Sequence, residues 1–219
     1  VEVVDGDAAL GAGRHLLDLV AETAERADLA VMHHHVVAQH ANRTVTVHDT
    51  LGHLDWPLLH RLYGACRAQD DEAFARWSAF LLANRETAEL RLEERQRGKA
   101  LARLLDGWQL CQAPAWRASV ELSQLGGMAW LAVHWDIPLR QLALGHGFAW
   151  LEGAVMAGVK LVPFGQQAAQ TLLRDLGADL PAALDQALAL GDDQLGGGLP
   201  LLAIASSRHE TQYTRLFRS

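Results

Sequence analysis

Histidines crowd the first sixty residues of this sequence, and imidazole is a preferred ligand for nickel, zinc and copper. His33, His34 and His35 are consecutive, and His40 follows shortly after them. Consecutive side chains point in different directions on a helix or a strand, so these three cannot face one ion without irregular backbone. The pattern therefore favours weak or fortuitous metal binding over a dedicated site, and the four histidines are weak candidate ligands.

The other reactive residues form no familiar catalytic arrangement. His209 and Glu210 are adjacent, but no second histidine follows at the spacing of a zinc-protease helix. Cys66 could serve as a thiol nucleophile with a histidine base, yet nothing in the sequence places such a pair together. Neither a phosphate-binding glycine loop nor a GxSxG turn is present. We therefore expect a protein that is not an enzyme and has no cofactor.

The elements that position these residues are predicted to be helices from Asp55 onward. Asp55, followed by Trp56 and Pro57, is a good start for one helix, and Asp70 or Asp71 begins the next. Asn84 is predicted to cap a long third helix. The first fifty-three residues read differently, because the stretch RTVTVHDT at 43–50 alternates like a short strand.

The long third helix is polar through its middle, at residues 93–99. Glu93 and Arg97 form a favourable pair four residues apart. Two interpretations stay open for this stretch, a solvated face and a partner-facing surface, and the first is favoured. Its final turns are predicted to belong to the core through Leu101, Leu104, Leu105 and Trp108.

Residues 138–162 are apolar almost all round, a pattern typical of a helix buried at the centre of a bundle or at an oligomer interface. Small residues recur along this helix, which would let neighbouring backbones approach closely; they are Gly145, Gly147, Gly153 and Gly158. Two shorter amphipathic helices are predicted at 166–176 and 181–190. The whole pattern predicts an all-α, single-domain helical bundle with an irregular N-terminal quarter.

The composition and charge of the chain exclude some classes of function. The chain has 219 residues and a formal net charge of −7, so its field would repel nucleic acid. No stretch reads as a membrane anchor or a signal peptide. Two cysteines without a paired spacing favour a cytoplasmic location.

The C-terminal stretch SSRHETQYTRLFRS combines arginines with Tyr213 and Phe217, which stand four residues apart and share a face if the segment is helical. Tyrosine and arginine are favoured at the centres of protein interfaces. This composition predicts a partner-binding tail, with a terminal helix docked on its own bundle as the alternative.

Three segments in a fixed order carry a family resemblance: NRETAELRLEERQRGKAL at 84–101, PLRQLALGHGFAWLEGAVMAGVKLVPFGQ at 138–166, and the C-terminal stretch at 206–219. Together they closely resemble the urease accessory protein UreF family. The resemblance runs from about Leu54 to Ser219, so we divide the chain into a divergent segment at 1–53 and a UreF-like helical domain at 54–219. The family's usual first segment, similar to SPALPVGGFSYSQGLE, has no match in residues 1–53, which leaves partner docking by that part in question.

The resemblance implies a cytoplasmic homodimer that is a scaffold rather than an enzyme. Its implied partners are a UreD-like protein, called UreH in some organisms, a nickel-carrying UreG-like GTPase and apo-urease. The expected contact residues lie in the tail and near the end of the apolar helix; they are Arg208, His209, Glu210, Thr211, Tyr213, Arg215, Phe217 and Lys160. The main alternative is a histidine-rich carrier of nickel or zinc. A helical regulator of transcription and a hydrolase using Cys66 are weaker alternatives.

Overall fold

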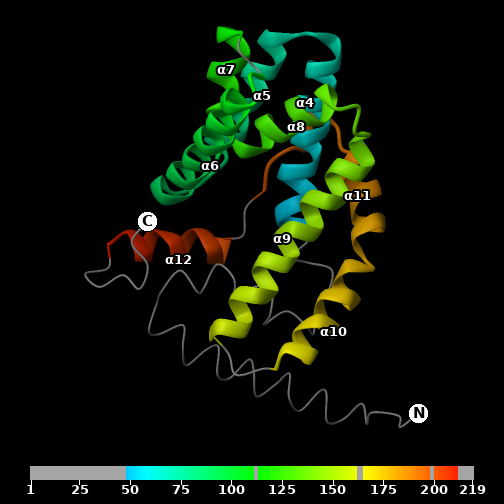
Figure 1. Cartoon of the computed structure of the whole chain (residues 1–219). Helices are drawn as coiled ribbons and strands as arrows, with labels where there is room; N and C mark the ends of the chain where they lie inside the picture. Colours follow the sequence, from blue (N-terminus) through cyan, green and yellow to red (C-terminus); the bar gives the residue numbers. More distant parts are fainter. Residues whose placement is uncertain (1–47, 111–112, 162–164, 198–199, 212–219) are drawn as a thin grey trace. The chain divides into compact units, whose positions relative to one another are not determined.

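The computed structural model describes residues 48–110, 113–161, 165–197 and 200–211 (Figure 1). Every regular element in these residues is helical and no strand occurs among them, which confirms the all-α prediction. In chain order the elements are η2 His48–Asp55, α4 Trp56–Ala68, α5 Asp71–Ala83, α6 Ala88–Gly107, α7 Pro114–Val120, α8 Gln124–His134, α9 Leu139–Leu161, α10 Gln166–Gly177, α11 Leu180–Leu188, η3 Asp192–Gln194 and α12 Pro200–Glu210. None of the helices in the described residues is both long and apolar enough to cross a bilayer.

Contacts divide the chain into two compact units. The larger unit comprises residues 47–147 and 180–199, and the smaller one contains α10, α12 and the part of α9 from Phe148 onward. In the larger unit α4 packs against α5, α8, α11 and η2, while α6 packs against α7 and α8 (Figure 1). The side chains of Trp56, Leu58, Leu59 and Leu62 on α4 are fully buried, so this helix forms the centre of the larger unit.

Trp56 fixes the approach of α4 to α9 within the larger unit. Its indole nitrogen donates a hydrogen bond to the carbonyl oxygen of Ala143 at 2.9 Å. A Cβ atom added to Gly147 would lie 2.4 Å from Trp56 Cζ2, so only glycine fits there. Gly147 thus lies against a side chain rather than the neighbouring backbone that the sequence predicts, and at Gly145 and Gly153 a Cβ would meet nothing within 4 Å.

In the smaller unit, α9 and α10 share an apolar cluster. Leu151, Ala154 and Val155 of α9 are buried with four residues of α10, namely Ala169, Leu172, Leu173 and Leu176. Trp150 is half-buried beside this cluster, whereas Phe148 is 46% exposed. Among the described side chains in this part of α9, those that pack on α10 are buried and Phe148 is not, and a dimer interface at the exposed side stays a prediction.

The helix boundaries follow local capping chemistry. Asp70 caps α5 as predicted, because its carboxylate accepts the N–H of Ala73 at 2.8 Å. Asn84, predicted to cap the next helix, instead ends α5, and the hydroxyl of Thr87 caps α6 by accepting the N–H of Leu90 at 3.2 Å. The strand predicted at 43–50 is wrong at His48–Thr50, which lie in the π-helical η2; the rest of it lies outside the described residues.

The core prediction for the end of α6 is wrong at two positions. Leu105 is fully buried and Leu101 half-buried, as expected, but Leu104 and Trp108 are each 47% exposed. Helical periodicity gives both residues the same face as Leu101, but that face is only partly covered at this end of α6. Their exposure leaves apolar surface at this end of the helix.

Candidate partner-binding site

Four of the predicted contact residues lie in the last turn of α12 and directly after it. Arg208 and Thr211 are exposed, Glu210 is half-buried, and His209 is buried at 4% exposure. The hydroxyl of Thr211 donates to the carbonyl of Arg208 at 2.9 Å, and its N–H reaches the same oxygen at 3.2 Å. The helix end therefore closes on itself, with the side chains of Arg208 and Thr211 exposed to solvent.

The remaining predicted residues are not assembled with this turn. Tyr213, Arg215 and Phe217 lie outside the described residues, as do the four candidate metal ligands His33, His34, His35 and His40. Lys160 stands one residue before the end of α9, and its side chain is likewise not described. Across the part of the chain that the structure describes, no three His, Cys, Asp or Glu side chains gather as metal ligands do.

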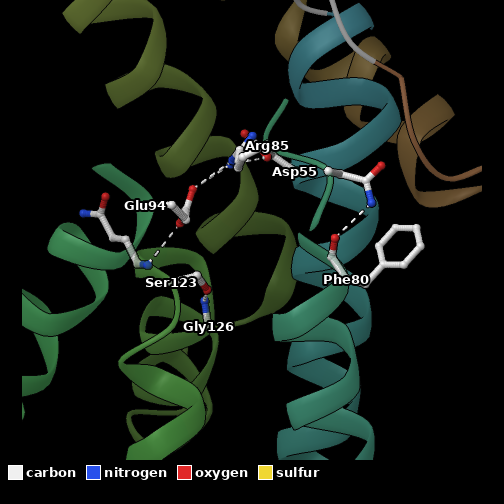
Figure 2. A network of polar contacts seen from close by, with 8 residues as sticks. Asp55, Phe80, Arg85, Glu94, Ser123 and Gly126 are labelled. Atoms are coloured by element: carbon white, nitrogen blue, oxygen red, sulfur yellow. Dashed lines mark hydrogen bonds and ion pairs between the residues drawn. The ribbon is translucent and has the colours of Figure 1, made fainter. Parts of the chain in front are cut away.

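A polar network in the larger unit joins η2 and α6 through Arg85, which lies in the link between α5 and α6 (Figure 2). Arg85 donates from Nε and Nη2 to Glu94 Oε2 at 3.0 and 2.8 Å, and from Nη2 to Asp55 Oδ1 at 2.9 Å. Both carboxylate side chains are only 11% exposed. Arg85 therefore links the end of η2 to α6 through a charge-assisted fork.

Glu94 extends the network to a third element, α8. Its Oε1 accepts the N–H of Gln124, the first residue of α8, at 3.2 Å. Ser123 caps the same helix, because its hydroxyl accepts the N–H of Gly126 at 2.9 Å (Figure 2). A carboxylate near a helix N-terminus is stabilised by the unpaired N–H groups and the helix dipole. The network thus sets where α6 and α8 meet.

The electrostatics of the network agree with its geometry. Burial alone would lower the pKa of Arg85, but attraction to Asp55 and Glu94 and the hydrogen bonds to both raise it well above its ordinary value. His146 on α9 lies in the same field, and its buried Nδ1 has no hydrogen-bond partner in the described structure. Burial lowers the pKa of His146; Asp55 opposes this shift, while Arg85 and Arg97 add to it.

Sequence reasoning missed this network. Asp55 was assigned a capping role, but its side chain makes no cap hydrogen bond and pairs with Arg85 instead. The segment NRETAELRLEERQRGKAL contains Arg85 and Glu94, but nothing in the sequence indicates that Arg85 also pairs with Asp55, thirty residues earlier. Because both carboxylates are occupied by Arg85, the network holds helices together rather than presenting free acid or base groups.

Comparisons with known proteins agree on one family. A model of the UreF family matches residues 44–177, so the match begins ahead of Leu54. A Pseudomonas putida protein named urease accessory protein UreF is 90% identical over 173 residues, which is 79% of this chain and 77% of that protein. Proteins of the same name from Klebsiella pneumoniae and an Enterobacter species are 58% and 55% identical over 166 residues, 76% of this chain and 74% of each of them.

Proposed function

The chain belongs to the UreF family, and from this premise we propose that it is a non-enzymatic cytoplasmic scaffold for the incorporation of nickel into urease. Membership in a family of urease accessory proteins gives it a role in urease maturation. The observation that supports the proposal most directly is the 90% identity over 173 residues to the Pseudomonas putida accessory protein. The proposed scaffold is a homodimer that bridges a UreD- or UreH-like protein and a UreG-like GTPase to apo-urease.

The proposed contacts follow the exposed end of α12 and the end of α9. Arg208 and Thr211 are open to solvent there and can form directional hydrogen bonds with a partner. The tail residues Tyr213, Arg215 and Phe217 would add an aromatic and cationic anchor. Lys160 is proposed to contact the GTPase, and the exposed Phe148 side of α9 is proposed to contribute to the dimer.

The test is urease activation in cells that carry a urease gene cluster with this chain deleted or restored. We expect inactive, nickel-poor urease without the chain and active enzyme with it, together with co-purification of the chain with the two accessory partners. Urease activity and nickel content per urease subunit are the measurements. Equal nickel loading with and without the chain would contradict the proposal.

The histidine-rich carrier alternative makes the opposite prediction about His33, His34 and His35. We expect the triple alanine variant to activate urease like the unchanged chain, because three consecutive side chains are poorly placed to share one ion. Nickel content of urease in cells is the readout, and nickel binding by the purified chain is its companion measurement. Loss of activation together with loss of stoichiometric nickel binding would favour the carrier.

A further inference from the structure

An exposed aromatic patch lies where two helices of the larger unit end. Trp108 at the end of α6 and Trp135 at the end of α8 are 47% and 50% exposed, and their ring centroids are 5.7 Å apart. Leu104, one turn before Trp108 on the same side of α6, is 47% exposed as well. Half-exposed tryptophans in contact leave apolar surface in water, which is typical of an interaction site. We call Leu104, Trp108 and Trp135 the aromatic end.

The helices α6 and α8 run side by side in the same direction to reach the aromatic end. In the second turn of α6, Glu94 accepts the N–H of Gln124, the first residue of α8. Further along, a Cβ atom on Gly127 would lie 2.5 Å from Leu101 Cδ2, and the two tryptophans then meet at the far end. Two helix C-termini therefore lie together. The backbone at such ends carries a partial negative charge that stabilises a nearby cation.

The backbone holds both tryptophans in place. They are the C-cap residues of α6 and α8, and each is followed by a residue in the left-handed region, Gln109 at φ 59° and Asp136 at φ 54°. In both cases the N–H of the next residue returns to a carbonyl of its helix at 2.8 Å. These are closed helix ends, so the aromatic end is a fixed surface.

The charged side chains at the aromatic end also favour a cation. Asp136 directly follows the tryptophan of α8, is exposed, and has no ion-pair partner among the described residues. Arg103, the cation of α6 nearest to it in sequence, lies roughly 140° around the helix from Trp108 and so points to another side. Arg97 lies on the side of the aromatic end, but it stands earlier on α6 and pairs with Glu93 at 2.6 Å. A cationic partner therefore meets no unpaired cation on this side of α6.

We infer that the aromatic end docks a basic segment of a partner protein by stacking an arginine side chain of that segment on its tryptophans. A planar guanidinium is attracted to an indole face, and arginine takes this role more often than lysine. The carboxylate of Asp136 can accept hydrogen bonds from the guanidinium, and Leu104 can cover the aliphatic part of the side chain. The net charge of −7 attracts a basic segment from a distance.

The partner is taken to be a component of urease maturation, so the inference rests on the proposed function. Ala100 is exposed one turn before Leu104 on the same side of α6, and it is replaced by the photo-crosslinking residue p-benzoyl-L-phenylalanine. The full chain with this residue is expressed with a urease gene cluster and illuminated, and the adducts are mapped by mass spectrometry. We expect an adduct with another polypeptide, in a segment that contains arginine and in which Lys and Arg outnumber Asp and Glu.

Variants of this chain test which groups hold the segment. W108A combined with W135A should lower the adduct yield roughly tenfold or more, because both stacking faces are lost. D136N removes one charge, keeps a side chain that tolerates the left-handed region, and should lower the yield about threefold. The matched controls are I204A and D179N, which change an exposed apolar residue and an exposed carboxylate elsewhere and should leave the yield within about 1.5-fold. Thermal melts of all variants separate lost docking from lost folding.

A reciprocal change in the partner does not depend on the folding of this chain. The arginine nearest to the mapped crosslink is changed to glutamine and, separately, to lysine. Glutamine should lower the adduct yield about fivefold or more, and lysine should lower it less, because an ammonium keeps the charge but not the planar stacking group. This measurement decides the matter if the tryptophan variant melts at a lower temperature than the unchanged chain.

The inference would be overturned by any of four results: no adduct, an adduct between two copies of this chain, an adduct in a segment without arginine, or a yield that survives both the tryptophan and the arginine changes. Urease activity of the same cultures keeps the two hypotheses apart. Chain-dependent urease activity without the adduct removes the docking surface and leaves the proposed function standing. Urease activity that does not depend on the chain overturns the proposed function, and with it the identity of the partner.

Discussion

Arg85 and Glu94 join η2, α6 and the start of α8 in one network. The guanidinium of Arg85 donates hydrogen bonds to one oxygen of Asp55 and one of Glu94. The other oxygen of Glu94 accepts a hydrogen bond from the first N–H of α8. Both carboxylates are mostly buried, so removing the cation leaves two largely desolvated charges without a counter-ion. The stability of the larger unit should therefore be unusually sensitive at this position.

We predict that Arg85→Ala lowers the free energy of unfolding by about 3–5 kcal/mol. Arg85→Lys keeps the charge but cannot form the fork to both carboxylates, so an intermediate loss is expected. The control is Arg174→Ala, which removes an arginine that is 75% exposed and should change stability by less than about 1 kcal/mol. Urea denaturation measures all three, and equal effects of Arg85→Ala and Arg174→Ala would contradict the assignment.

A second residue-scale prediction concerns His146 and pH. Burial and the nearby Arg85 and Arg97 keep this histidine neutral when folded, whereas the unfolded chain takes up a proton as the pH falls through the ordinary histidine value of 6.5. The folded pKa is lowered, so its contribution to stability is present above pH 6.5 and is lost as the pH falls below that value. The loss approaches about 1.4 kcal/mol per pH unit while only the unfolded state is protonated.

His146→Gln should flatten the decrease in unfolding free energy between pH 6.5 and pH 5.5. Asp55, Arg85 and Arg97 are the charged groups that act on His146, and all three remain in this variant. His134→Gln is the control, since His134 is exposed and stacks on Trp130 with ring centroids 5.2 Å apart. Thermal melts across the pH range provide the readout, and parallel profiles for His146→Gln and the unchanged chain would contradict the prediction.

At the scale of elements, Gly98 and Gly64 offer a matched pair of helix glycines. A Cβ atom on Gly98 would lie 2.7 Å from both the oxygen of Glu121 and the nitrogen of Ser123, which are backbone atoms of the link between α7 and α8. On Gly64, in α4, it would meet nothing within 4 Å. Backbone cannot give way as a flexible side chain can, so only one of these positions tolerates alanine.

We predict that Gly98→Ala lowers the free energy of unfolding by about 2–3 kcal/mol, because α6 must move away from the link. Gly64→Ala should instead raise it by about 0.5–1 kcal/mol, since alanine reduces the conformational freedom of the unfolded chain. Chemical denaturation of the two variants checks the opposite signs. A stabilised Gly98→Ala variant would show that the two segments are less closely packed.

The comparison of sequence with structure also belongs to this scale. Periodicity and capping residues predicted most helices, because these signals are local: α10 and α11 were expected at 166–176 and 181–190 and occur at Gln166–Gly177 and Leu180–Leu188. The Asp55–Arg85 pair and the exposure of Trp108 depend on which helices meet in space. Apolar periodicity shows which side of a helix is apolar. It does not show how far along the helix a neighbouring element covers that side, because tertiary contacts decide this.

At the scale of the whole molecule, the 84–101 segment divides into two kinds of residue. Four of its residues stabilise the fold. Arg85 and Glu94 form an ion pair, Thr87 caps α6, and Gly98 allows a close approach to the backbone between α7 and α8. The exposed residues Arg95 and Lys99 have no such task in the described structure. Of the two interpretations that the sequence left open for this stretch, the structure therefore supports a solvated face.

The last prediction concerns the tail after α12. Removing residues 208–219 would also remove His209, which is buried, so loss of function in that variant could reflect lost packing. A chain that ends at Thr211 keeps α12 intact and removes Tyr213, Arg215 and Phe217. If the tail serves a partner or the second copy, this shorter deletion should melt within about 2 °C of the full chain and no longer co-purify with the UreD-like protein. A clearly lower melting temperature would show instead that the tail packs on its own bundle.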